Sequence, residues 1–253
     1  MINVLLYGCN GHMGHVIADL IAGMNDIQIA AGVDPFGDNQ AAFPVFRSLD
    51  DCDVKADVII DFSSASAVDS VLDYACSRQI PLVECTTGLS EDQIAHLEKC
   101  SESVAILRSA NMSLGINTLM KLLKTAARIL GDAGFDIDIV EKHHRRKLDA
   151  PSGTALALAD SINEASDQRY EYVFDRSQRR EQRPADEIGI SAVRGGTIVG
   201  VHDVIFAGTD EVVEISHTAY SRAIFGKGAI EAAKFLTGKP AGLYDMSHVI
   251  DQK

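Results

Sequence analysis

The fold of this chain is indicated first by its N-terminal sequence, Ile2-Asn3-Val4-Leu5-Leu6-Tyr7-Gly8-Cys9-Asn10-Gly11-His12-Met13-Gly14. Residues 2–7 form a short apolar run, which is typical of a strand buried on both faces of a parallel sheet. Residues 13–24 carry apolar side chains at helical spacing. The glycines between them follow the pattern G-x-x-G-x-x-G, a variant of the dinucleotide-binding fingerprint. The opening therefore predicts a strand, a phosphate-binding turn and a helix.

An acidic residue stands where such a site needs one. A second strand, predicted at residues 27–33, ends at Asp34. A carboxylate at this position can bind the ribose hydroxyls of adenosine and would repel a 2′-phosphate, and the neighbouring Pro35 and Phe36 offer no cation. We therefore predict a nicotinamide cofactor, NADH or NADPH, with a preference for NADH. The alternative is a glycine turn that serves packing alone.

The rest of the first 113 residues alternates between the two kinds of element. Strands are predicted at residues 56–62, 81–84 and 104–108, and helices at residues 65–77 and 90–100. Strands separated by helices predict a parallel sheet with helices on both faces. The loops Thr86–Gly88 and Ser109–Ser113 follow two of these strands, where cofactors bind in such sheets. Ordinary turn chemistry or helix capping by Asn111 or Ser113 is the alternative for these loops.

The pattern changes after residue 113. The spacing predicts helices at residues 114–130 and 153–163, a half-buried strand at 135–142, and a polar surface excursion at 164–186. Three strand-like runs at residues 188–194, 198–206 and 211–218 are joined by glycine-rich turns, which favours antiparallel hairpins in an open sheet. A last helix is predicted at residues 228–236. We expect an α/β domain of residues 1–113 and 223–253 and an α+β domain of residues 114–222.

Composition narrows the class of protein. The 253 residues include 36 acidic and 23 basic side chains, which gives a net charge of −13. Such a charge disfavours binding to nucleic acid and to anionic membranes. The five cysteines are scattered without a C-x-x-C pair, so we expect no disulfide framework or zinc site and a reducing compartment. No signal peptide or membrane span is recognisable, and the expected location is cytoplasmic.

One basic segment stands out in this acidic chain. Six of the seven residues from Glu141 to Lys147 can carry positive charge. The segment runs through Asp149-Ala150-Pro151 to Ser152-Gly153-Thr154, which open a predicted helix and would present backbone N–H groups and hydroxyls to an anion. This arrangement predicts a carboxylate or phosphate substrate, and a solvated charged face is the alternative. Metal binding is disfavoured, because adjacent histidines seldom point to one ion.

The same segment resembles a known family. Residues 141–155 read Glu-x-His-His-Arg-x-Lys-x-Asp-Ala-Pro-Ser-Gly-Thr-Ala, which is similar to the signature of the 4-hydroxy-tetrahydrodipicolinate reductase (dihydrodipicolinate reductase) family. The resemblance extends over the chain, to Gly8–Gly14, Asp61–Ser63, Thr86–Gly88, Asn111–Ser113, His217–Arg222, Phe225 and Gly228-Ala229.

The resemblance implies a fold and an activity. The fold is an α/β Rossmann-like dinucleotide-binding domain plus an α+β substrate and oligomerisation domain with an open mixed β-sheet, assembled as a homotetramer. The activity is the NAD(P)H-dependent reduction of a cyclic dicarboxylate imine to tetrahydrodipicolinate in lysine and diaminopimelate biosynthesis.

Residue roles follow from the resemblance position by position. It implies that His143 donates and accepts protons, that Lys147 is a second proton donor, and that the substrate carboxylates are held by His144, Lys147, Ser152, Gly153 and Thr154. The cofactor residues are Gly8, Cys9, Asn10, Gly11, His12, Met13, Asp34, Cys85, Thr86, Thr87, Ala110, Asn111, Met112 and Ser113. Cys85 and Met112 depart from the glycine and phenylalanine usual in the family. Lys142 and Arg146 occupy variable positions and receive no role.

Two rival functions belong to other classes. A different two-domain reductase, such as an aspartate or homoserine dehydrogenase, would also act on a small carboxylate, but the run His143–Thr154 argues against it. A nicotinamide-sensing module without catalysis would normally carry a nucleic-acid or partner-binding segment. The chain has no helix-turn-helix pattern, and its charge is acidic.

Overall fold

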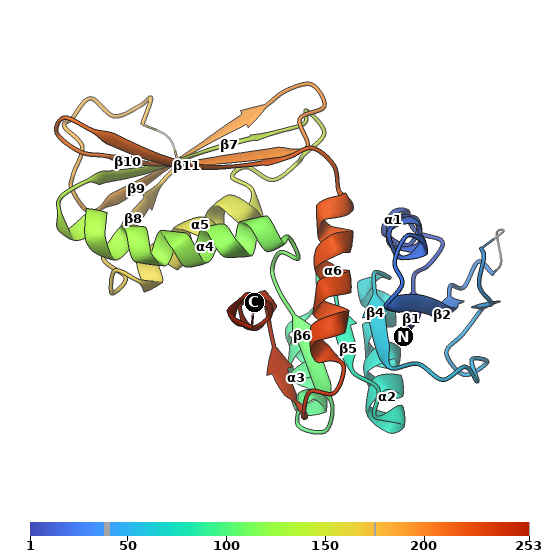
Figure 1. Ribbon diagram of the computed structural model, residues 1–253. Coiled ribbons are helices and arrows are strands. Elements are labelled where there is room, and N and C mark those ends of the chain that lie inside the picture. Colours follow the sequence, from blue (N-terminus) through green and yellow to red (C-terminus); the bar gives the residue numbers. More distant parts are fainter. Residues whose placement is uncertain (38–40, 175, 253) are drawn as a thin grey trace. The chain divides into compact units, whose positions relative to one another are not determined.

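The structure is a computed structural model that describes residues 1–37, 41–174 and 176–252 (Figure 1). It divides into two compact units. Unit 1 comprises Met1–Leu114 and the segment from Ala223 onward, and unit 2 comprises Gly115–Arg222.

Unit 1 is a parallel α/β sheet. Its elements are β1 (Ile2–Tyr7), α1 (His12–Ala22), β2 (Ile27–Val33), β3 (Val45–Phe46), β4 (Val58–Asp61), the 3₁₀ turn η1 (Ala65–Ala67), α2 (Val68–Arg78), β5 (Leu82–Glu84), α3 (Glu91–Ser101), β6 (Ala105–Arg108), α6 (Ala223–Leu236), β12 (Gly242–Tyr244) and α7 (Met246–Asp251). The strand order is β12-β6-β5-β4-β1-β2-β3, with every neighbouring pair parallel. The predicted Rossmann-like sheet is confirmed, and β3, β12 and α7 are additions that the sequence did not predict.

The apolar run in β1 is explained by the two layers that cover it. Val4, Leu5 and Leu6 are all 0% exposed. Successive side chains of a strand point to opposite faces, so Val4 and Leu6 pack in a cluster with α1 and α6, whereas Leu5 packs in a second cluster with α2 and α3. Burial of each such side chain contributes about 1.5–3 kcal/mol, which makes the central strand a strong determinant of the fold.

Unit 2 is an open mixed sheet covered on one face by two helices (Figure 1). Its elements are α4 (Leu114–Ala126), the π-helical turn η2 (Ala127–Gly131), β7 (Asp136–His143), α5 (Gly153–Glu164), β8 (Glu171–Val173), β9 (Glu187–Arg194), β10 (Gly200–Ala207) and β11 (Val212–Ala219). The strand order is β11-β10-β7-β9-β8. The open mixed sheet implied by the family resemblance is confirmed.

One predicted hairpin is wrong. The glycine-rich turn after β9 was expected to join β9 and β10 as antiparallel neighbours, but β9 pairs in parallel with β7, and β10 lies on the other side of β7. The reason is the pairing of both strands with β7 over seven residue pairs each, and the turn continues the β7–β9 ladder, since Gly195 N–H donates to the carbonyl of His143 at 2.9 Å. Only β10 and β11 form the predicted antiparallel pair. Strand β8 lies within the segment predicted as a surface excursion.

The described part of the chain has no helix that combines the length and the hydropathy that a bilayer crossing requires.

Candidate active site

The basic segment begins on a strand whose alternation buries two polar side chains. Along β7 the residues alternate between half-buried and buried positions, and Ile137 and Ile139 occupy the buried face. The same period places Glu141 and His143 on that face, with exposed fractions of 0% and 8%. A carboxylate and an imidazole are therefore held together against the helices of unit 2.

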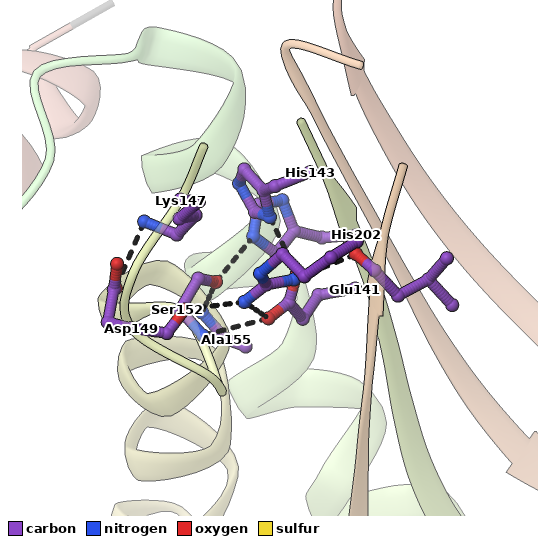
Figure 2. Close-up of polar contacts among 9 residues, drawn as sticks. Glu141, His143, Lys147, Asp149, Ser152, Ala155 and His202 are labelled. Atoms are coloured by element: carbon purple, nitrogen blue, oxygen red, sulfur yellow. Dashed lines mark hydrogen bonds and ion pairs between the residues drawn. The ribbon is translucent and has the colours of Figure 1, made fainter. Parts of the chain in front are cut away.

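Glu141 is the centre of the site (Figure 2). Its Oε2 accepts a hydrogen bond from His143 Nδ1 at 2.6 Å, and its Oε1 accepts one from Ser152 N–H at 2.9 Å. The Arg194 guanidinium donates to both oxygens, at 2.7 and 2.6 Å, in the fork geometry that suits a carboxylate. Burial alone would raise the pKa of Glu141, but these donors hold the pKa below its ordinary value. Glu141 is therefore a buried anion.

The imidazole of His143 is fixed by this anion. A carboxylate at Nδ1 favours the tautomer that carries its proton on Nδ1, which leaves the lone pair on Nε2. The ring packs edge-on against His202, with the centroids 5.2 Å apart. His202 is 4% exposed, its Nε2 lies 3.2 Å from Ser152 Oγ, and burial, followed by the effect of His143, lowers its pKa to about 4. His202 is thus neutral at neutral pH, and Nε2 is the nitrogen of His143 that does not face the Glu141 carboxylate.

Lys147 returns to the same place through a turn. Its backbone N–H donates to the carbonyl of His144, three residues earlier, at 3.1 Å, so the two residues lie on one turn. The ammonium of Lys147 pairs with Asp149 at 3.0 Å, and the pairing lowers the pKa of the Asp149 carboxyl. Because Asp149 is 57% exposed, this pair is open to exchange with a carboxylate from solution.

Ser152 is the N-cap residue of helix α5. It is 1% exposed, its hydroxyl accepts from Ala155 N–H at 3.1 Å, and its own N–H is bonded to Glu141. Ser152 is therefore the cap of the helix, and its contact with the substrate stays a prediction. Gly153 and Thr154 follow, exposed and half-buried, at the positive end of α5.

In unit 1, the glycine turn has the geometry that the fingerprint predicts. Gly8 has φ of +77°, and a Cβ there would lie 2.7 Å from the carbonyl oxygen of Phe62. A Cβ at Gly14 would lie 2.4 Å from the carbonyl oxygen of Cys9, so helix α1 packs on the turn only with glycine at this position. Gly11 precedes α1 without a side-chain cap, which leaves the first N–H groups of the helix for an anion.

The residues beside the turn fit an adenosine. A cleft of about 230 Å³ is lined by Tyr7, Gly8, Gly11, Asp34, Pro35, Phe36, Phe62, Ser63, Ser64 and Ala67. The carboxylate of Asp34 accepts from Asn10 N–H and Phe36 N–H, both at 3.1 Å, and so ties the turn to the end of β2. Phe36 is 88% exposed and offers a flat apolar face. A larger cavity of about 510 Å³ near Cys9 and His15 has neither the free helix end nor the exposed ring.

The other predicted cofactor residues differ in how far their side chains are exposed to solvent. Asn10, His12, Met13, Thr87, Ala110 and Asn111 are exposed or half-buried, whereas Cys9, Thr86, Met112 and Ser113 are buried. Cys9 and Met112 belong to the apolar core, so only their backbone can reach a ligand. The Met112 carbonyl closely abuts Gly228 of α6, where a Cβ would lie 1.6 Å from it. Cys85 is half-buried, and burial raises the pKa of its thiol well above the ordinary value.

Two residues that contact this candidate site, Arg194 and His202, were not predicted. Arg194 lies 53 residues beyond Glu141 and meets it because β9 pairs with β7. His202 comes from β10, the other neighbour of β7. The role of Glu141 had a signal in the sequence, because the alternation of Ile137 and Ile139 continues to it.

The chain matches known proteins along its whole length. A family model described as "Dihydrodipicolinate reductase, N-terminus" matches residues 2–112, and one described as "Dihydrodipicolinate reductase, C-terminus" matches residues 115–250. The chain is 52% identical over 250 residues to the 4-hydroxy-tetrahydrodipicolinate reductase of Caldanaerobacter subterraneus subsp. tengcongensis, with 99% of this chain and 98% of that protein covered. It is 46% identical over 251 residues to the protein of the same name from Clostridium tetani, with the same coverage.

A solved structure shares the fold. The dipicolinate-bound dihydrodipicolinate reductase of a Paenisporosarcina species superposes with a TM-score of 0.81 at 23% identity, and 97% of each chain is covered.

Proposed function

Because the chain belongs to the dihydrodipicolinate reductase family, we propose that it reduces a cyclic dicarboxylate imine to tetrahydrodipicolinate in lysine and diaminopimelate biosynthesis. It is an NAD(P)H-dependent oxidoreductase. The observation that carries the proposal is the convergence of the anion-held His143, the Lys147 ammonium and the N-terminus of α5 in one place.

The substrate carboxylates are assigned to the basic side chains and the helix end. His144 and Lys147 lie on one turn, and Gly153 and Thr154 stand at the start of α5. A carboxylate at the α5 N-terminus gains from the positive end of the helix dipole. A second carboxylate replaces Asp149 as the partner of the Lys147 ammonium. The two anchors together orient a dianionic ring.

Proton transfer is assigned to His143 and Lys147. A bound nicotinamide supplies the hydride that the imine-type carbon accepts, and the ring system left behind takes a proton. His143 Nε2, when protonated, and Lys147 Nζ are the groups of this site that can give that proton. Glu141 and Arg194 hold the imidazole in place, and the positive groups stabilise negative charge as it develops on the substrate.

The cofactor is assigned to unit 1. Gly8–Met13 supply the turn and helix end for the pyrophosphate, Asp34 the ribose contact, and Cys85–Thr87 and Ala110–Ser113 the strand-end loops. Asp34 supports the proposed preference for NADH, because its carboxylate repels a 2′-phosphate. One cation stands nearby, since the guanidinium of Arg47 lies 3.2 Å from the Cβ position of Gly37. We therefore expect the protein to prefer NADH but also to bind NADPH.

The experiment is NADH oxidation in the presence of freshly generated substrate, with the variants Lys147→Ala and Arg146→Ala. We expect Lys147→Ala to lower turnover by about 100-fold or more, the usual share of a general acid, with NADH affinity nearly intact. Arg146 is exposed and has no assigned role, so Arg146→Ala should behave as the parent. Equal loss of turnover and NADH affinity in Lys147→Ala would contradict its place at the substrate, and no oxidation by folded, NADH-binding parent would favour a sensor.

Assembly and location complete the proposal. Unit 2 is assigned to substrate binding and to a homotetramer, and the cell compartment to the cytoplasm. Light scattering measures the assembly directly, and we expect a mass four times that of the 27.2 kDa chain.

A further inference from the structure

Two acidic side chains are enclosed at the ends of neighbouring strands in unit 1. Asp61 ends β4 and Glu84 ends β5, and the two residues are partners in the parallel register. Their exposed fractions are 0% and 1%. Two ionised carboxylates in this position would be unfavourable, because burial of a charge without a counter-charge costs free energy.

The pair bonds to the loops that leave the two strands. Asp61 Oδ1 accepts from Ser63 N–H at 2.8 Å, and Asp61 Oδ2 accepts from the Thr86 hydroxyl at 3.2 Å. Glu84 Oε1 accepts from Thr86 N–H at 2.7 Å. Thr86 is thus held by both acids. The backbone of Phe62, between Asp61 and Ser63, also lies directly against Gly8, so the glycine turn contacts the loop that Asp61 holds.

Among the residues that the structure describes, no Lys, Arg or His side chain forms a hydrogen bond or an ion pair with Asp61 or Glu84. Tyr7 of β1 and Cys85 are the titratable groups that face the pair, and burial beside these carboxyls raises the pKa of both side chains. Asp34 adds a further negative charge next to Tyr7. Within the described residues, Glu84 Oε2 is buried without a hydrogen-bond partner. An enclosed oxygen with neither donor nor cation is expected to carry a proton, and burial followed by the charge of Asp61 raises the pKa of Glu84 to about 9.

We propose that Asp61 and Glu84, holding one proton between them, are positioning residues that fix the Ser63 and Thr86 loops for nicotinamide cofactor binding, and that loss of this proton weakens that binding. The inference rests on the proposed function, since it assigns the cofactor to these loops. Removal of the proton puts two negative charges side by side in a buried place, and the loops that bond to them must move apart to admit water.

The test is the dissociation constant of NADH, followed by its fluorescence between pH 7 and pH 10 in the parent, Glu84→Gln and Glu98→Gln. The glutamine retains an acceptor for Thr86 N–H but cannot ionise, and Glu98 is an exposed glutamate on α3 of the same unit. With a proton lost near pH 9, the parent's dissociation constant should rise about tenfold from pH 8 to pH 10. Glu98→Gln should follow the parent, whereas the constant of Glu84→Gln should change less than about twofold.

Two results would overturn the inference. The first is a dissociation constant of NADH for the parent that does not change between pH 7 and pH 10. This result does not depend on the folding of any variant. The second is a folded Glu84→Gln whose alkaline rise equals that of the parent. Absence of NADH binding to the parent at every pH would instead contradict the cofactor assignment itself, and the inference with it.

Discussion

Replacement of Glu141 by glutamine tests the arrangement of the candidate active site most directly. Glu141→Gln keeps the size of the side chain but puts an N–H₂ group where one oxygen now accepts hydrogen bonds. The present oxygens accept from His143, Ser152 and, twice, from Arg194. Whichever way the amide is turned, it points N–H donors at other donors and leaves the Arg194 charge without its anion.

The magnitude follows from the burial of the pair. Loss of one partner from a buried ion pair costs about 3–5 kcal/mol. Arg194 keeps 19% exposure of its side chain and a second acceptor, the Asp149 carbonyl at 2.6 Å, which places the cost near the lower end, at about 3 kcal/mol. The imidazole also loses the acceptor that orients it, so we expect turnover to fall about 100-fold, within the range of general acid–base catalysis.

The assay combines urea unfolding with steady-state rates and NADH binding. Because the folded-state pKa of Glu141 lies below its ordinary value of 4.5, its stabilisation is present above pH 4.5 and is lost as the pH falls through the folded-state pKa. The stability gap between parent and variant should therefore close in acid. NADH affinity should not change, since Glu141 lies in unit 2, and Glu171→Gln on strand β8 is the matched exposed control. A folded Glu141→Gln that retains turnover within threefold of the parent refutes the positioning role.

Two further predictions concern acid stability and cofactor choice. Burial lowers the pKa of His202 from 6.5 to about 4, so between these pH values His202 is protonated in the unfolded chain but not in the folded chain. The free energy of unfolding of the parent should therefore fall by about 3 kcal/mol between pH 6.5 and pH 4. His202→Gln should lack this loss in urea unfolding, and an unchanged acid limb would contradict the assignment. For the cofactor, Asp34→Ala should shift the ratio of dissociation constants toward NADPH and Arg47→Ala toward NADH, each by about tenfold for one lost charge contact, or about 1.4 kcal/mol. Parent protein that binds NADPH more than tenfold better than NADH would show that Asp34 was misinterpreted.

The sequence predicted what local pattern decides. The apolar run of β1, the glycine turn and the sequence Ser-x-x-Gln at Ser90–Gln93, where the helix predicted at residues 90–100 begins, each act within a few residues, and the predicted strand, turn and helices are present. The capping box is formed in full, with Ser90 and Gln93 bonded to each other's backbone. Strand order was not predictable in this way. The turn at Gly195-Gly196 looks like a hairpin loop from its residues, and the pairing of β9 and β10 with opposite edges of β7 makes it a crossover.

The charge state of a buried acid is likewise not predictable from local sequence, as two glutamates of this chain demonstrate. Glu141 and Glu84 are equally enclosed, at 0% and 1% exposure, and each ends near a polar loop. The pKa of Glu141 lies below its ordinary value because Arg194 and two further donors offset its burial, whereas burial and Asp61 raise the pKa of Glu84. The partners that decide the outcome come from other strands, β9 for Glu141 and β4 for Glu84. The charge state of a buried glutamate is therefore not known until strand pairing is known. Pairing makes Glu141 an anion that orients the imidazole of His143, and Glu84 an acid that holds a proton.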